Sequence, residues 1–206
     1  MSAALRFRNF LFVRFSHFIV RLIYKTSKIT IYGNFNLLDD GNEYLIVFWH
    51  GDSCIYYPLF RDKNICVLTT TTMRGDNISG IIRLFGYVPI QAPDEDDGKN
   101  HILRIRGESR GKHLGVTLDG PAGPHHVPKR FVILLSRVCK KPMMPIAVRV
   151  KRKLIINSRW DKYMIPLPFS RIDFYVGDPI DAKLHKNADE QVVEFMSNPE
   201  NYRISV

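Results

Sequence analysis

A histidine stands at the end of a short apolar run in this sequence, in the segment FWHGD at 48–52. The run at 44–48 is rich in residues that favour β-strands, and a helical pattern follows it. A histidine at such a strand-to-helix turn can act as a general base, and Gly51 would let a substrate approach the backbone closely. The motif therefore predicts proton abstraction by His50. A structural, hydrogen-bonding histidine is the alternative.

A second polar motif follows the apolar run at 115–118 and reads DGPAGP at 119–124. Its two Gly-Pro pairs predict a rigid, non-helical turn with exposed backbone amides. Asp119 could orient an imidazole or accept a hydrogen bond from a substrate hydroxyl, and a structural turn capped by this aspartate is the alternative. Lys129 and Arg130 follow closely, so an anionic group beside the loop would have cations within reach.

Both motifs depend on elements that alternate along the chain. Helices are predicted at 52–60, 78–85, 100–110, 130–140 and 188–196, and strands at 44–48, 65–70, 87–90, 115–118, 144–150, 154–157 and 172–176. Strands separated by helices predict an α/β fold with a mostly parallel central sheet flanked by helices. Ligands of such sheets bind beyond the carboxyl ends of the strands, where both polar motifs fall.

The segment 5–28 precedes this domain and predicts an amphipathic helix. It is rich in Phe, Leu, Ile and Val, and its polar residues recur at steps of three and four, which gathers them in one stripe: Arg14, His17, Arg21, Lys25 and Lys28. A wide apolar face with an acid-free cationic stripe suits the interface of an anionic membrane, and packing on the domain is the alternative. We therefore expect a membrane-interface helix at 1–30 and one α/β domain at 31–206. No uncharged apolar stretch is long enough to predict a membrane span.

The 206 residues carry a net charge of +10, concentrated in the segments 1–38 and 120–160, which contain no acidic residue. An anionic partner is therefore expected at these two segments. Nucleic acid is disfavoured because the second segment has no interleaved aromatics and no known reader motif. The three cysteines are widely spaced and predict neither a disulfide framework nor a metal site.

Five features in order resemble one family: FWHGD at 48–52, a strand and a helix ending in LFGY at 84–87, TLDGPAGP at 117–124, KPMMPIAV at 141–148 and the segment 158–180. They resemble the small bacterial lysophospholipid-acyltransferase-like proteins marked by W-H-G and D-G-P-x-G-P, which are related to the glycerolipid acyltransferases. The resemblance covers roughly 25–180. In that family a histidine deprotonates an acceptor hydroxyl, which attacks the thioester of acyl-CoA or acyl carrier protein.

The resemblance implies that His50 is the base and that Asp119 helps to hold the acceptor. The family's signature aspartate is replaced here by Ile55, so Asp52 or Asp119 is expected to orient the imidazole instead. Ala122 stands where a cation is usual, and Arg74 begins a segment that usually reads Asp-Gly-acid. The expected substrate-binding residues are Gly51, Arg74, Gly120, Pro121, Gly123, Pro124, Lys129 and Arg130.

The same resemblance implies a membrane lipid as acceptor, an acyl donor as co-substrate, and no metal or other cofactor. Acyl carrier protein is a candidate partner beside the anionic membrane surface. The expected location is peripheral, at the cytoplasmic face of the inner membrane. Two other functions stay open: transfer of sugar or lipopolysaccharide-precursor groups, for which no nucleotide-sugar motif is evident, and a non-catalytic basic binding protein.

Overall fold

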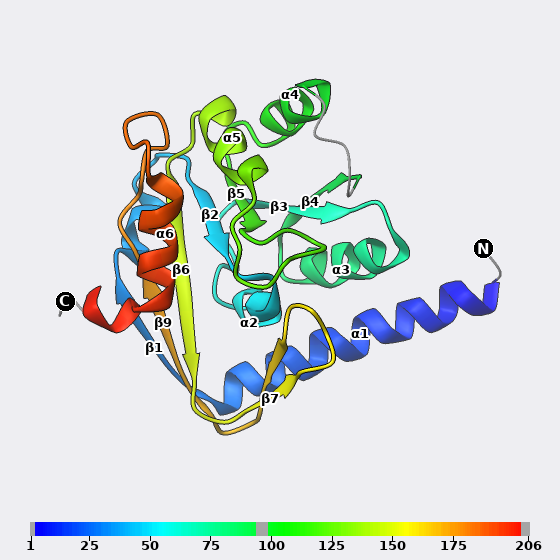
Figure 1. Cartoon of the computed structure of the whole chain (residues 1–206). Coiled ribbons are helices and arrows are strands. Elements are labelled where there is room, and N and C mark those ends of the chain that lie inside the picture. The colour runs from blue at the N-terminus through cyan, green and yellow to red at the C-terminus, as the bar shows by residue number, and fades with distance from the viewer. Residues whose placement is uncertain (1–2, 94–98, 203–206) are drawn as a thin grey trace.

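The computed structural model describes residues 3–93 and 99–202, and its centre is a seven-stranded sheet in the order β1-β9-β6-β2-β5-β3-β4 (Figure 1). The strands of this sheet are β1 (Lys28–Gly33), β2 (Leu45–Phe48), β3 (Ile65–Thr70), β4 (Val88–Ala92), β5 (His113–Thr117), β6 (Met143–Val150) and β9 (Arg171–Val176). Neighbouring strands run parallel, except that β6 and β9 are antiparallel. The predicted mostly parallel α/β fold is confirmed.

Helices cover the sheet and a small ribbon stands beside it. The helices are α1 (Ala3–Thr26), α2 (Ser53–Tyr56), α3 (Met73–Leu84), α4 (Lys99–Glu108), α5 (Arg130–Cys139) and α6 (Ala188–Ser197). The ribbon consists of β7 (Lys153–Ile156) and β8 (Tyr163–Pro166), paired antiparallel. α3 packs on β3 and β4, α6 packs on β6, and α4 packs on α5. The strands β2 and β6 lie at the centre of the core, with nearly all of their side chains buried.

Two predicted helices differ from the structure, and two observed strands were not predicted, in each case for local reasons. The predicted helix at 52–60 is only Ser53–Tyr56, because Pro58 cannot continue a helix in the chain that follows. α3 begins at Met73, five residues before the predicted start, because the Thr72 hydroxyl accepts a hydrogen bond from the Gly75 amide and caps the helix. The strands β1 and β8 were not predicted. β8 contains a proline, a residue that is unfavourable in strands. β1 begins at Lys28, which the predicted first helix included.

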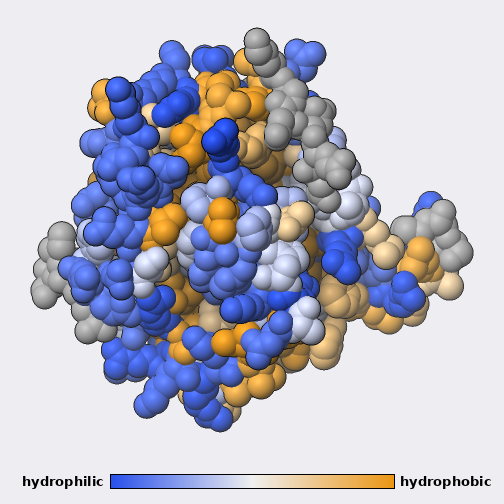
Figure 2. Space-filling view, viewed as in Figure 1, coloured by the Kyte–Doolittle hydropathy of each residue, from blue (hydrophilic) through white to orange (hydrophobic). Residues whose placement is uncertain are grey.

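The predicted N-terminal helix is present as α1, but only one narrow face of this helix packs against the rest of the domain. Val13 packs on Gly80 of α3, and the His17 ring lies against the Phe85 ring with centroids 4.5 Å apart. His17 therefore does not belong to an exposed stripe, and its burial, with neighbouring arginines, lowers its pKa. The other apolar side is open to solvent at Phe7, Phe10, Leu11, Phe12, Phe15, Phe18 and Leu22, and apolar surface follows the projecting helix in Figure 2. Within the described ranges, no helix is both long and apolar enough to cross a membrane.

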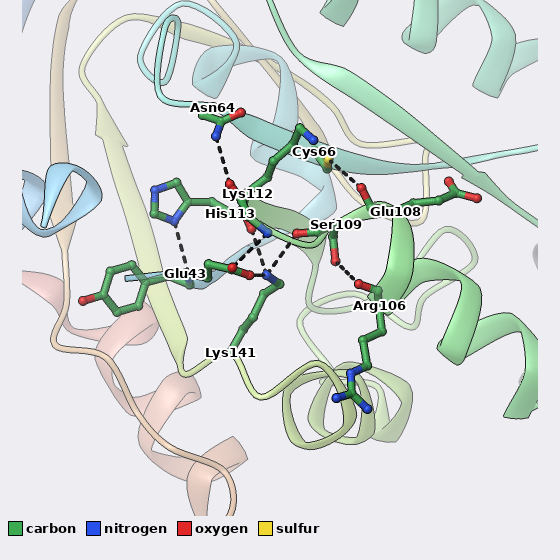
Figure 3. Close-up of polar contacts among 11 residues, drawn as sticks. Glu43, Asn64, Cys66, Arg106, Glu108, Ser109, Lys112, His113 and Lys141 are labelled. Carbon is green, nitrogen blue, oxygen red and sulfur yellow. Dashed lines mark hydrogen bonds and ion pairs between the residues drawn. The ribbon is translucent and has the colours of Figure 1, made fainter. Parts of the chain in front are cut away.

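The buried side chain of Lys141 links the amino ends of β2, β5 and β6 (Figure 3). These ends lie at the edge of the sheet opposite the motifs FWHGD and DGPAGP. Lys141, just before β6, forms an ion pair with Glu43, just before β2. Its ammonium also donates to the carbonyls of Ser109 and Lys112, at 3.1 and 2.9 Å, in the turn before β5. Burial is the largest single influence and would raise the pKa of Glu43. The hydrogen bond and charge of Lys141, together with the hydrogen bond from the Gly111 amide, outweigh burial and hold the pKa below its usual value.

We expect Lys141→Met to lower the free energy of unfolding by about 2–3 kcal/mol at neutral pH, because the buried Ser109 carbonyl and the partly buried Lys112 carbonyl lose a charged donor. Since the pKa of Glu43 is depressed in the folded state, its share of stability is present above the ordinary carboxylate pKa and is lost as pH falls through the folded pKa. Urea unfolding at pH 7 and in the acid range measures both effects. Lys140→Met, at the exposed neighbouring lysine, is the matched control. Equal stability of the two variants would contradict this role for Lys141.

Candidate active site

His50 and a distant aspartate form a hydrogen-bonded pair at the carboxyl end of β2. The chain leaves β2 at Phe48 and turns through the 3₁₀ helix η2 (His50–Asp52). The His50 ring nitrogen Nδ1 lies 2.7 Å from Oδ2 of Asp161, which belongs to the turn between β7 and β8. The Asp161 side chain is completely buried, whereas 26% of the His50 side chain is exposed. With Nδ1 donating to Asp161, Nε2 becomes the basic ring nitrogen.

Arg159 holds Asp161 in its ionised form. Its Nε lies 2.9 Å from Oδ1 and its second guanidinium nitrogen lies 2.7 Å from Oδ2, so the contact is forked. Burial raises the pKa of Asp161, but the hydrogen bonds from Arg159 and His50 outweigh burial and leave the pKa below its ordinary value. The guanidinium also lies over the Tyr163 ring, 4.7 Å from its centroid. Asp161 is therefore an ionised carboxylate fixed against the imidazole.

Two glycines of the sequence motifs make room for the same turn. A Cβ on Gly51 would lie 2.2 Å from the backbone oxygen of Asp161, and a Cβ on Gly123 would lie 2.4 Å from the Trp160 ring. Gly123 also has a φ of +72°, which favours glycine. The backbone of Asp161 therefore fills the space that a Cβ on Gly51 would occupy, and the approach of a substrate to Gly51 stays a prediction. Both glycines allow the 158–162 turn to close on His50.

Asp119 contacts the backbone of His50 and not its ring. It is buried after β5, and its Oδ1 accepts a hydrogen bond of 2.9 Å from the His50 backbone amide. Its Oδ2 accepts a longer one, 3.4 Å, from the His126 amide, while burial raises the pKa of Asp119. Because β2 and β5 are parallel neighbours, their carboxyl ends bring the two predicted motifs together. Asp119 therefore fixes the backbone of the turn that carries His50, whereas Asp161 is the acid that contacts the imidazole ring.

Asp52 and Ile55 follow His50 into the protein interior. Burial raises the pKa of Asp52 to about 7; Lys153 and Arg149 oppose this shift, and the Asp119 charge adds to it. No hydrogen bond to its carboxylate is found in the described part of the chain. Ile55, where the resemblance implied a signature aspartate, is buried and lines an apolar pocket. The carboxylate that contacts the His50 ring comes from position 161.

The predicted cations lie near this edge of the sheet, and no contact among the described residues joins them to His50. The Lys129 side chain runs along Gly120, at the start of α5, and Arg130 is exposed in the first turn of that helix. Arg74 is exposed in the first turn of α3, and Pro121 and Pro124 are exposed on the loop. These residues therefore lie near the His50–Asp161 pair, and their role in binding a substrate stays a prediction.

Aromatic rings border the site on two sides. The His50 and Trp160 ring centroids are 5.2 Å apart, and the His126 ring stacks on Trp49 at 4.4 Å. Burial and the neighbouring His125 lower the pKa of His126 to about 4, so its ring is neutral at ordinary pH. Sequence reasoning missed Arg159, Trp160 and Asp161 as site residues. They lie within the segment 158–180 that carries the resemblance, but nothing in their spacing pointed to His50.

An apolar pocket of about 320 Å³ lies between α1 and the elements that hold the pair. Cys54 and Ile55 line it from the chain just after His50, and Tyr163 lines it two residues beyond Asp161. Its α1 wall consists of Phe12, Phe15, Ser16, Ile19, Val20, Ile23 and Tyr24. Burial raises the pKa of Cys54 to about 11, which keeps its thiol neutral. The pocket is apolar enough to hold a hydrocarbon chain, and its lining includes residues that follow His50 and Asp161 closely along the chain.

Comparison with known proteins agrees with this architecture. No protein-family model matches the chain. It is 28% identical over 190 residues to the uncharacterized protein RP090 of Rickettsia prowazekii, and the match covers 85% of each chain. Among solved structures it is similar to the crystal structure of the 1-acyl-sn-glycerophosphate (LPA) acyltransferase PlsC from Thermotoga maritima, with a TM-score of 0.57 and 16% identity. That match covers 94% of this chain and 86% of the other. The chain therefore has an acyltransferase-like fold.

Proposed function

We propose that this protein is an O-acyltransferase that moves a fatty acyl group from a thioester to the hydroxyl of a lysophospholipid or a related lipid. The observation that carries the proposal is the His50–Asp161 pair beside an apolar pocket. The similarity to the fold of PlsC supports the same class of reaction. Acyl-CoA and acyl carrier protein are both candidate donors.

In the proposed reaction His50 is the general base. Asp161 keeps the proton on Nδ1, so Nε2 accepts the proton of the acceptor hydroxyl. The hydroxyl oxygen forms a bond to the thioester carbonyl carbon, and the carbon–sulfur bond then breaks. The leaving thiolate takes the proton back from the imidazolium, which restores His50. Asp161 stabilises the imidazolium between these steps.

Binding of the substrates is assigned to the surroundings of the pair. The apolar pocket would hold an acyl chain, and burial of that chain would contribute about 0.8 kcal/mol for each CH₂ group. The exposed cations Arg74 and Arg130 at the same edge of the sheet would attract the anionic groups of the substrates. The exposed phenylalanines and the cations of α1 would hold the enzyme peripherally on an anionic membrane, at its cytoplasmic face.

The proposal is tested by incubating the purified protein with a labelled long-chain acyl-CoA or acyl carrier protein and a panel of lysophospholipids. Diacyl product should form with at least one acceptor and should be absent without protein. Mass spectrometry of lipids from cells with and without the protein identifies the natural product. Hydrolysis of the thioester with no acylated lipid in either experiment would contradict acyl transfer.

A further inference from the structure

Strand β7 leaves three successive apolar side chains exposed: Leu154, Ile155 and Ile156. In the ribbon, Leu154 is paired with Ile165, and Ile156 is paired with Tyr163. Paired residues of antiparallel strands project from the same face of a ribbon. Since Ile165 and Tyr163 line the apolar pocket, Leu154 and Ile156 continue its wall outward onto the protein surface.

The other side of the pocket mouth is equally apolar and exposed. Phe12 and Phe15 of α1 line the pocket and are also open to solvent. At the base of the ribbon the amide of Phe169, an exposed residue, lies 3.4 Å from the Thr26 hydroxyl oxygen and donates to it. The ribbon overlaps α1 in the view of Figure 1, and Ile165 and Pro166 of β8 line the pocket together with residues of α1. Leu154 and Ile156 therefore belong to one apolar surface that surrounds the pocket mouth.

Cations border this surface. Lys151, Arg152 and Lys153 lead into β7 and are exposed, and Lys162 is exposed in the turn of the ribbon. A shallow basin of about 430 Å³ at the base of the ribbon is lined by Arg149, Lys151, Lys153 and Arg171, together with Asp173 and Val150. The segment 120–160 contains no acid, and Asp161, the next along the chain, is buried. Exposed apolar side chains with a cationic border match the surface of an anionic bilayer.

We propose that β7 is a second bilayer-contacting segment beside α1, in which Leu154 and Ile156 enter the boundary between the headgroups and the acyl chains of anionic lipids. The turn of the same ribbon carries Asp161, so this contact brings the His50–Asp161 pair and the pocket mouth to the bilayer surface. A lipid chain can then enter the pocket without crossing water. This last consequence rests on the proposed function, whereas the contact between β7 and lipid does not.

The test compares Leu154→Asp with Leu103→Asp in the full-length protein. The two leucines are matched, since 56% and 55% of their surfaces are exposed, and Leu103 lies in α4, on the side of the sheet away from α1 (Figure 1). Flotation with vesicles of phosphatidylglycerol and phosphatidylethanolamine measures the partition coefficient. We expect Leu154→Asp to lower it about tenfold, because a leucine is no longer buried in the bilayer, and Leu103→Asp to leave it unchanged. Leu154→Asn, which adds no charge, should also lower it.

A second readout reports the position of β7 directly. The fluorescence of Leu154→Trp, after subtraction of the wild-type signal, should be quenched by phospholipids with brominated acyl chains, and that of Leu103→Trp should not. Equal partitioning of the two aspartate variants, or absence of quenching at position 154, would overturn the proposal. A dimer in lipid-free sedimentation that Leu154→Asp converts to a monomer would overturn it too, because the surface would then bind a second copy of the chain.

An activity measurement connects the contact with the proposed function. Leu154→Asp should slow acylation of bilayer-embedded lysophospholipid about tenfold and slow acylation of detergent-dispersed lysophospholipid far less. Loss of vesicle binding in a protein that acylates neither substrate would support the bilayer contact and count against acyl transfer. Slowing on both substrates alike would contradict the link between β7 and the presentation of lipid.

Discussion

Replacement of His50 by alanine is expected to lower the turnover of acyl transfer roughly 10²–10⁴-fold, the usual contribution of a general base. The acceptor hydroxyl would then have to lose its proton to water. The turn that holds His50 should persist, because the Asp119 carboxylate binds the backbone amide of residue 50 and not the imidazole. The Michaelis constants for donor and acceptor should therefore change little, while turnover falls.

The measurement is steady-state formation of acylated lipid, with circular dichroism and thermal unfolding as checks of the fold. His185→Ala removes an exposed histidine far along the chain and should leave turnover unchanged. Wild-type activity should also fall at acid pH, because a protonated imidazole cannot accept the hydroxyl proton. A folded His50→Ala protein with near-normal turnover would refute the assignment of the base.

The second large effect is expected at Asp161. Asp161→Asn should lower turnover on the order of 10²–10⁴-fold, because an amide neither enforces the proton on Nδ1 nor stabilises the imidazolium. Asp161→Glu, which keeps the carboxylate, should recover part of the turnover.

Asp173→Asn is the matched control, because Asp173 also accepts a hydrogen bond from an arginine, Arg171, and lies outside the site. It should leave turnover unchanged. If Asp161→Asn lowered thermal stability but kept wild-type turnover, Asp161 would have only a structural role. A loss of turnover in a folded Asp161→Asn protein, with partial recovery in Asp161→Glu, separates positioning of the base from support of the fold.

Local patterns were enough to predict much of this protein. The apolar runs predicted strands β2, β3, β4, β5, β6, β7 and β9 within two residues, and their alternation with helices predicted the mostly parallel sheet. These features depend on periodicity over a few residues, which any single sequence displays. The positions of His50 and Asp119 at the carboxyl ends of β2 and β5 followed from the same patterns, and the parallel pairing of these strands brings the two residues together.

Only the tertiary structure decided which acid meets the imidazole, which atoms fill the space beside the glycines and which side of α1 stays exposed. His50 and Asp161 are 111 residues apart, and their contact depends on the ribbon β7–β8 folding back over the end of β2. The space beside Gly51 is filled by the Asp161 backbone, which no property of the segment FWHGD could indicate. His17 has the helical spacing of a solvent-facing stripe, yet it packs on Phe85 because the orientation of α1 is set by its contacts with α3. Hydrophobic periodicity indicates which residues share one face of a helix or strand. Which other element packs against that face is determined by contacts between residues far apart in the sequence.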